Sequence, residues 1–286
     1  MNITLSHENP ADYRVVEQLT REAFWGCMSP TCDEHYLVHL LRGCTCFVPE
    51  LDYVARVDGE IVGSILYSRA HIIANDGRRF EVLTFGPLSV APTFWNKGVG
   101  TALVRHSIRE AKQLGYRAIV IYGHPDYYPR FGFRTADTYR ITTPEGTSMD
   151  ALMALPLHDG ALDGVSGTFQ EDDVFHVDAQ EAQEFDRTFP YREPALMISI
   201  DVLLEHLKPA VGSAFTDRGI QTLASLTRFS GREISRWDGM DDETMATVNR
   251  ILSDHGYAKK PLPKQHRDNE GHRVSQFHLY QGIGCE

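Results

Sequence analysis

The feature that most constrains this sequence is a glycine turn between a strand-like and a helix-like segment. Residues 80–90 are rich in β-branched and aromatic side chains and end at a proline. After the turn at 95–101, residues 100–114 carry apolar side chains at helical spacing. Glycine lets the backbone approach a ligand closely, and the first turn of a helix offers N–H groups that lack intrahelical partners. The turn therefore predicts a seat for a pyrophosphate group.

Two common phosphate-binding loops do not fit this turn. A P-loop requires its lysine after the last glycine, whereas Lys97 here precedes Gly98. A dinucleotide-binding fingerprint requires a third glycine at the position of Leu103. Both classes of nucleotide site are therefore excluded for this loop.

The turn does resemble the coenzyme A loop of the GNAT acetyltransferase superfamily, which usually reads Gln/Arg-x-x-Gly-x-Gly/Ala. Trp95 stands where the family has Gln or Arg, but main-chain N–H groups hold the phosphates, so the loop geometry should survive. Residues 83–90 resemble the strand that pairs with pantetheine, and 128–133 resemble the family's fourth helix and turn. With the segment 160–167, the chain is most similar to the YhbS-like branch over about residues 1–185.

The resemblance implies an α/β fold, the GNAT acyl-CoA acyltransferase fold, in which helices flank a mixed sheet. The residue patterns are consistent with it. They predict helices at 12–25 and 33–42, and strands at 52–57, 61–73, 80–90, 117–122 and 149–157.

The resemblance also implies the chemistry. An acetyl group would pass from the thioester of acetyl-CoA, the co-substrate, to a primary amine by direct attack. Tyr128 matches the tyrosine that lies beside the coenzyme A sulfur, which makes it the expected general acid. The residues expected to bind the cofactor are Leu88, Ser89, Val90, Trp95, Asn96, Lys97, Gly98, Val99, Gly100, Thr101 and Phe131.

The general base is less clear from the sequence. Many relatives use a glutamate on the fourth strand, but Thr84 occupies that register here, and threonine cannot act as a base. Glu81 and His124 are the titratable residues nearest the expected position. Each can equally be an ordinary surface group, so the base stays unassigned.

Composition limits the class of protein. The chain has 286 residues, which suggests two domains because one core seldom grows beyond about 250–300 residues. No segment reaches the roughly 20 apolar residues of a membrane span, and residues 1–5 lack the pattern of a signal peptide. We therefore expect a cytoplasmic protein without membrane contact. The net charge of −11 argues against nucleic acid as a general partner.

The five cysteines could be either metal ligands or reduced thiols. Cys27, Cys32, Cys44 and Cys46 lie in the first part of the chain with two histidines between them, and Cys285 lies near the end. Because Cys-x-Cys is not the usual spacing of a zinc knuckle, we favour reduced, partly buried thiols and expect no metal.

The composition changes in the second half of the chain, where prolines break the pattern. We place the acetyltransferase domain at 1–186, a linker at 187–198, a helical module at 199–258 and a tail at 259–286. The module resembles the C-terminal domain of the RNA polymerase α subunit, a small all-α relative of the helix-hairpin-helix fold. The parent's DNA-contacting arginine and asparagine fall at Ala210 and Ser213.

Two function classes follow. The first is an N-acetyltransferase that acts on a small-molecule or protein amine. The second is an acyl-CoA-sensing regulatory protein whose helical module engages a partner. Residues 241–243 are three adjacent carboxylates and the span 201–257 has a net charge of −3, from nine acidic and six basic residues. A protein partner is therefore favoured over DNA. Family members are often dimers, so a homodimer is also expected.

Overall fold

The computed structural model describes residues 1–27, 29–227, 229, 231–255 and 257. The predicted tail at 259–286, with Cys285, lies outside them. The chain forms two compact units, of which the first runs to Ala195 and the second begins at Leu196. That division falls within the predicted linker at 187–198. No helix in the described part of the chain is long and apolar enough to cross a membrane.

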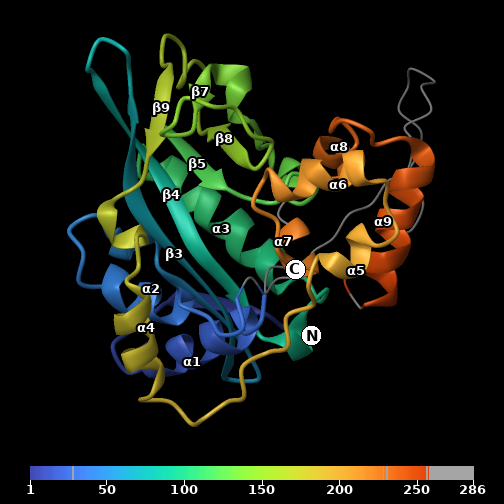
Figure 1. Ribbon diagram of the computed structural model, residues 1–286. Coiled ribbons are helices and arrows are strands. Elements are labelled where there is room, and N and C mark those ends of the chain that lie inside the picture. The colour runs from blue at the N-terminus through green and yellow to red at the C-terminus, as the bar shows by residue number, and fades with distance from the viewer. Residues whose placement is uncertain (28, 228, 230, 256, 258–286) are drawn as a thin grey trace. The chain divides into compact units, whose positions relative to one another are not determined.

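The first unit is built on a mixed sheet with the strand order β1-β2-β3-β4-β5-β8-β6 (Figure 1). β4 and β5 run parallel, whereas the other neighbours along this path are antiparallel. β9 pairs with the free edge of β3 near its end and, in parallel, with β7. The strands are β1 Thr4–His7, β2 Tyr53–Val57, β3 Glu60–Ile73, β4 Arg79–Val90, β5 Ala118–Tyr122, β6 Arg134–Thr135, β7 Ile141–Thr142, β8 Leu152–Pro156 and β9 Gly167–Gln170.

Helices cover both faces of this sheet, as the α/β prediction requires. α3 (Val99–Gln113) buries Leu103 and Val104 in a core that also contains Leu83, Phe85, Leu88 and Val90 of β4. α1 (Tyr13–Phe24) and α2 (Glu34–Leu41) lie on the opposite face, where Val16 and Val38 form a cluster with β2 and β3. The alternation of side chains along a strand thus gives each face its own core.

One helix was missed by the sequence prediction. α4 (Ala179–Asp186) forms in the acidic stretch 171–185, which the sequence analysis did not assign to a helix. Asp178 caps it by accepting from two backbone N–H groups. Asp186 at its end forms an ion pair with Arg21 of α1, with Nε and Oδ1 2.6 Å apart. This charge pairing fixes a helix whose own apolar pattern is weak.

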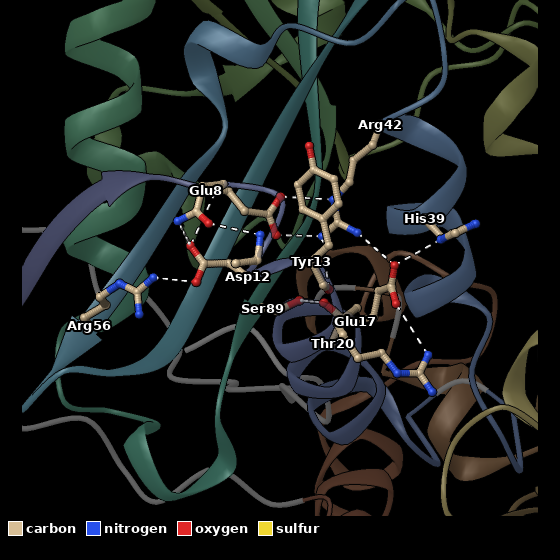
Figure 2. Close-up of polar contacts among 12 residues, drawn as sticks. Glu8, Asp12, Tyr13, Glu17, Thr20, His39, Arg42, Arg56 and Ser89 are labelled. Carbon is tan, nitrogen blue, oxygen red and sulfur yellow. Dashed lines mark hydrogen bonds and ion pairs between the residues drawn. The ribbon is translucent and has the colours of Figure 1, made fainter.

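Buried charges hold α1 and α2 to the first strands (Figure 2). Arg42, just after α2, donates to both carboxylate oxygens of Glu8 at 2.6 and 3.0 Å, and to Glu17 of α1 at 2.9 Å. These three side chains are almost completely buried. Burial, and next the Glu8 carboxylate, raise the pKa of Asp52 to about 9, so this neighbouring acid stays neutral at pH 7. One guanidinium therefore joins two carboxylates from separate segments.

The second unit is a small helical module with its own core. Phe215 and Phe229 meet the ring of Trp237 edge-on, at centroid distances of 5.4 and 5.1 Å. Thr222 and Asp241 cap two of its helices through their side chains. The described helices are α5 Asp201–Leu204, α6 Pro209–Thr216, α7 Leu223–Leu226, α8 Gly231–Ile234 and α9 Asp242–Asp254. The helix-hairpin-helix relationship stays a prediction.

We expect Arg42→Met to lower the free energy of unfolding by about 3–5 kcal/mol, because it leaves Glu8 and Glu17 buried without their cation. Urea denaturation followed by circular dichroism measures this change. Arg78→Met is the matched control, since Arg78 pairs with Asp76 at an exposed turn and should change stability by at most about 1 kcal/mol. Equal losses in the two variants would contradict the structural role of Arg42.

Candidate active site

The sheet opens between β4 and β5. The ladder joins Leu83 to Ile119, and within the described residues it contains no later pair, although β4 continues to Val90 and β5 to Tyr122. β4 also contains one more residue than β3 between the pairs Ile65↔Leu88 and Tyr67↔Phe85. This bulge surrounds the Gly86-Pro87 peptide, which is cis. An extra residue bends the strand that carries it, so β4 turns away from β5 at this point.

The glycine turn lies directly after β4. Asn96 and Gly98 adopt positive φ values of 58° and 85°, which favour Asn and Gly over most other residue types. Gly98 is the N-cap of α3, and the first turn of that helix contains Val99, Gly100 and Thr101. The predicted phosphate seat is therefore a helix N-terminus beside the open end of the sheet.

Trp95 has a structural task in this turn. Its indole Nε1 donates to the carbonyl oxygen of Val90 at 2.8 Å, so the side chain ties the loop back to the end of β4. The neighbouring Lys97 ammonium lies 5.1 Å from the ring centroid of Phe94. The side chain that departs from the family pattern thus fixes the loop on the strand that precedes it.

The predicted pantetheine strand is connected to α1. The Ser89 hydroxyl is buried and lies 2.9 Å from the Thr20 hydroxyl (Figure 2). Leu88 and Val90, on either side, belong to the core that α3 covers. The Ser89 side chain therefore serves packing, and any cofactor contact at this residue involves its backbone.

Tyr128 begins a short 3-10 turn, Tyr128–Phe131, where the sequence resemblance suggested the family's fourth helix. Its ring is buried among other aromatic rings, with centroid distances of 5.8 Å to Phe85 and 5.6 Å to Phe133. A Cβ atom at Gly123 would lie 2.4 Å from this ring. Gly123, directly after β5, thus makes room for the Tyr128 ring. The ring centroids of Tyr128 and Phe131 are 6.3 Å apart.

The two candidate bases lie in less suitable places. Glu81 is exposed, with its carboxylate 3.9 Å from Arg69. It is three residues from Thr84 in a regular part of β4, so the two side chains face opposite sides of the sheet. His124 uses Nδ1 to accept the backbone N–H of Asp126, which holds the turn before Tyr128. Neither geometry is that of an exposed base aimed at the open end of the sheet.

Glu171 is a titratable residue of this region that no sequence motif singles out. Thr84, at the register of the absent glutamate, donates its hydroxyl to Glu171 Oε1 at 3.4 Å. Burial raises the pKa of Glu171 to about 7, while the Thr84 hydrogen bond and the charge of His176 oppose the rise. β9, which precedes Glu171, has a weak sequence signal. The pairing of β9 with β3 is what brings this carboxyl to Thr84.

A pocket of about 330 Å³ lies at the edge of β3 beside Glu171. It is lined by Thr45, Cys46, Arg69, His71, Arg79, Gln170, Glu171, Asp172 and Asp173. In the same region the Cys44 thiol donates to Asp172 at 3.5 Å. Burial raises the pKa of the Cys46 and Cys32 thiols. None of the four cysteines among the described residues forms a disulfide, which agrees with the predicted reduced thiols.

Aromatic residues in and next to α1 and α2 form hydrogen bonds to the last part of the first unit. Tyr36 donates to Glu181 of α4 at 3.0 Å, and Trp25 donates to the Glu193 carbonyl at 3.0 Å. His39 lies 3.1 Å from Glu17. Tyr36 and Trp25 thus contact α4 and the chain after it, whereas His39 links α2 to α1.

Comparison with known proteins agrees with this geometry. Residues 17–133 match the model of the Acetyltransferase (GNAT) family. The crystal structure of YhbS from Escherichia coli in complex with CoA superposes with a TM-score of 0.55 at 27% identity, over 61% of this chain and 92% of YhbS. The first unit thus has the GNAT fold, and its sequence is similar to those of GNAT N-acetyltransferases. Its bent β4, glycine turn and following helix lie within the matched range.

Two relatives in sequence are N-acetyltransferases of Escherichia coli K12 that are themselves uncharacterized. YjhQ is 37% identical over 86 residues, which make up 30% of this chain and 46% of YjhQ. The chain thus spans about half the length of that relative. YhbS is 28% identical over 170 residues, or 59% of this chain and 96% of YhbS. The helical second unit lies beyond the GNAT family match.

We expect Trp95→Phe to weaken acetyl-CoA binding about fivefold, because it removes the hydrogen bond to Val90, a loss of about 1 kcal/mol. Isothermal titration calorimetry measures the dissociation constant. Tyr116→Phe removes a hydroxyl elsewhere in the domain and serves as the control. An unchanged affinity in Trp95→Phe would show that the indole N–H does not position the loop.

Proposed function

We propose that the protein transfers an acetyl group from acetyl-CoA to a primary amine by direct attack. The observation that supports this most strongly is the divergence of β4 from β5 beside the N-terminus of α3. The divergence leaves room for the pantetheine arm along residues 88–90, and the helix N-terminus suits the pyrophosphate. Backbone N–H groups near the bulge are suited to polarise the thioester carbonyl.

Tyr128 is the proposed general acid. Its ring packs beside the open end of the sheet, where the resemblance places the coenzyme A sulfur. A thiol has a pKa of about 8.5, so a proton donor assists departure of the thiolate at neutral pH. The acceptor is a small-molecule amine or a lysine of a protein, and the helical second unit binds a protein partner in preference to DNA because of its acidic hairpin.

Acetyl-CoA titration tests the cofactor site. Wild type should bind, and Gly98→Glu should lose binding, because a side chain at φ 85° is strained and the added carboxylate repels phosphate. Gly59→Glu, at another positive-φ glycine in the β2–β3 turn, is the matched control for backbone strain and charge. Absence of binding to wild type would contradict the proposal.

Release of free thiol with spermidine, kanamycin or a lysine-containing peptide tests the reaction. We expect turnover with at least one of these amines, and an approximately 10²-fold lower kcat in Tyr128→Phe with unchanged acetyl-CoA affinity. Tyr139→Phe is the control for loss of a hydroxyl. Tight binding of acetyl-CoA with no thiol release would favour the acyl-CoA-sensing alternative, in which the second unit transmits the signal.

A further inference from the structure

We propose that Glu171 is the general base that takes up the proton of the acceptor amine. This inference rests on the acetyl transfer proposed above and adds the residue that the sequence could not supply. The carboxyl comes from the segment after β9, a part of the chain far in sequence from β4.

Position is the first argument. Thr84 directly follows Leu83, the last residue of β4 that pairs with β5, and precedes the bulge at Gly86-Pro87. The thioester must lie near this point if pantetheine follows residues 88–90. The hydrogen bond from Thr84 to Glu171 therefore holds a carboxyl at the place where the sheet opens. Burial, and next the charge of Glu171, raise the pKa of Tyr122, the last residue of β5, so this tyrosine also lies close to the carboxyl.

The face of the sheet is the second argument. Thr84 shares its face with Ser68, its ladder partner on β3, and this is the face that α1 and α2 cover further along. α3 and the phosphate seat belong to the opposite core. Glu171 thus approaches the opening from the side away from α3. An amine that enters there meets the carbonyl carbon without passing the bound cofactor.

Protonation is the third argument. A general base works best when its pKa is close to the working pH, and burial brings the pKa of Glu171 to about 7. The charged or titratable groups around Glu171 come from several elements. They are Tyr122 of β5, Cys46 before β2, Arg69 and His71 of β3, Arg79 of β4, and Asp172, Asp173 and His176 of its own segment.

The neighbouring carboxyl groups have other contacts, are exposed, or lie on the other face of the sheet. Asp172 accepts the backbone N–H of Val174 and the Cys44 thiol. Asp173 is exposed, and Glu81 faces the other side of the sheet. Glu171 is therefore the carboxyl that combines partial burial with a contact to Thr84.

The proposed step balances in atoms and charge. The amine nitrogen attacks the carbonyl carbon, a C–N bond forms, and Glu171 takes the N–H proton. The C–S bond then breaks, and the thiolate takes a proton from Tyr128. Glu171 afterwards returns its proton to water, and solvent restores the proton of Tyr128.

The decisive experiment measures kcat/KM against pH, using whichever of spermidine, kanamycin or the lysine-containing peptide wild type acetylates. A base must be deprotonated, so wild-type activity should fall as the pH drops through about 7. Glu171→Gln should bind acetyl-CoA as wild type does, yet lose about 10²-fold or more in kcat/KM. Its remaining activity should lack that acidic limb. Glu50→Gln, at an exposed carboxyl, is the matched control.

A second variant tests position without removing the carboxyl. The Thr84 hydroxyl lowers the pKa of Glu171, so Thr84→Val should move the acidic limb of the profile to higher pH. A merely structural effect of the substitution would lower activity at every pH and leave the limb unmoved. That result would overturn the assignment of the limb to Glu171.

A stability measurement reports on the same group without an acceptor. The raised pKa of Glu171 means that folding binds a proton between the ordinary glutamate value and about 7, so stability is lost as the pH rises through this range. Glu171→Gln should therefore melt at a higher temperature than wild type at pH of about 8. At pH of about 5 the difference in melting temperature should be smaller. The same difference at both pH values would contradict a raised pKa.

The outcomes separate the two proposals. If wild type binds no acetyl-CoA or releases no thiol, the proposed acetyl transfer fails. If wild type turns over and Glu171→Gln retains more than a tenth of kcat/KM with the acidic limb in place, the base assignment alone fails.

Discussion

The bend in β4 is the constraint on which the first unit depends. One extra residue between the pairs with Ile65 and Tyr67 displaces the strand from β5 after Leu83. Without this divergence β4 and β5 would pair to their ends, and the backbone would have no room for a pantetheine arm. The glycine turn follows this bent strand, and Trp95 ties the turn to Val90 at the end of β4. The cofactor seat and the reaction centre thus follow from one local irregularity in a strand.

The elements on the two faces of the sheet have different roles. α3 packs on one face and presents its N-terminus beside the end of β4. On the other face, buried charge pairs centred on Arg42 hold α1 and α2, and Asp186 of α4 holds the end of the unit through Arg21. The loop after β9 reaches the same face and delivers Glu171 to Thr84. Ionic contacts thus hold the helices on this face, and the loop after β9 brings the proposed base to it.

Much of the fold could be predicted from the sequence, whereas the roles of the site residues stay predictions. Helices α1, α2 and α3 and strands β2 to β5 and β8 carry clear apolar periodicity, so their ranges agree closely with the predicted segments. The glycine turn has its own signature, and its residues form the start of α3 as expected. α4 was not predicted, because a capping aspartate and an ion pair with α1 stabilise it, and local periodicity does not reveal either contact.

The proposed base could not be predicted from the sequence for a similar reason. Counting back from the glycine turn put Thr84 at the register of the usual glutamate, but a replacement carboxyl need not be near in sequence when a distant strand brings it near in space. Glu81 and His124 were the candidates nearest that register in the sequence, and strand alternation puts Glu81 on the face opposite Thr84. The one available signal was the short β-prone stretch before Glu171 at the end of the family resemblance, and its pairing partner on β3 cannot be deduced from one sequence.

A crystal structure of the full chain with CoA would test the central claim most directly. The account predicts the pyrophosphate at the N-terminus of α3, pantetheine along residues 88–90, and the sulfur between the Tyr128 hydroxyl and the Thr84–Glu171 pair. A CoA molecule whose sulfur lies away from that pair, or one bound outside the opening between β4 and β5, would contradict it.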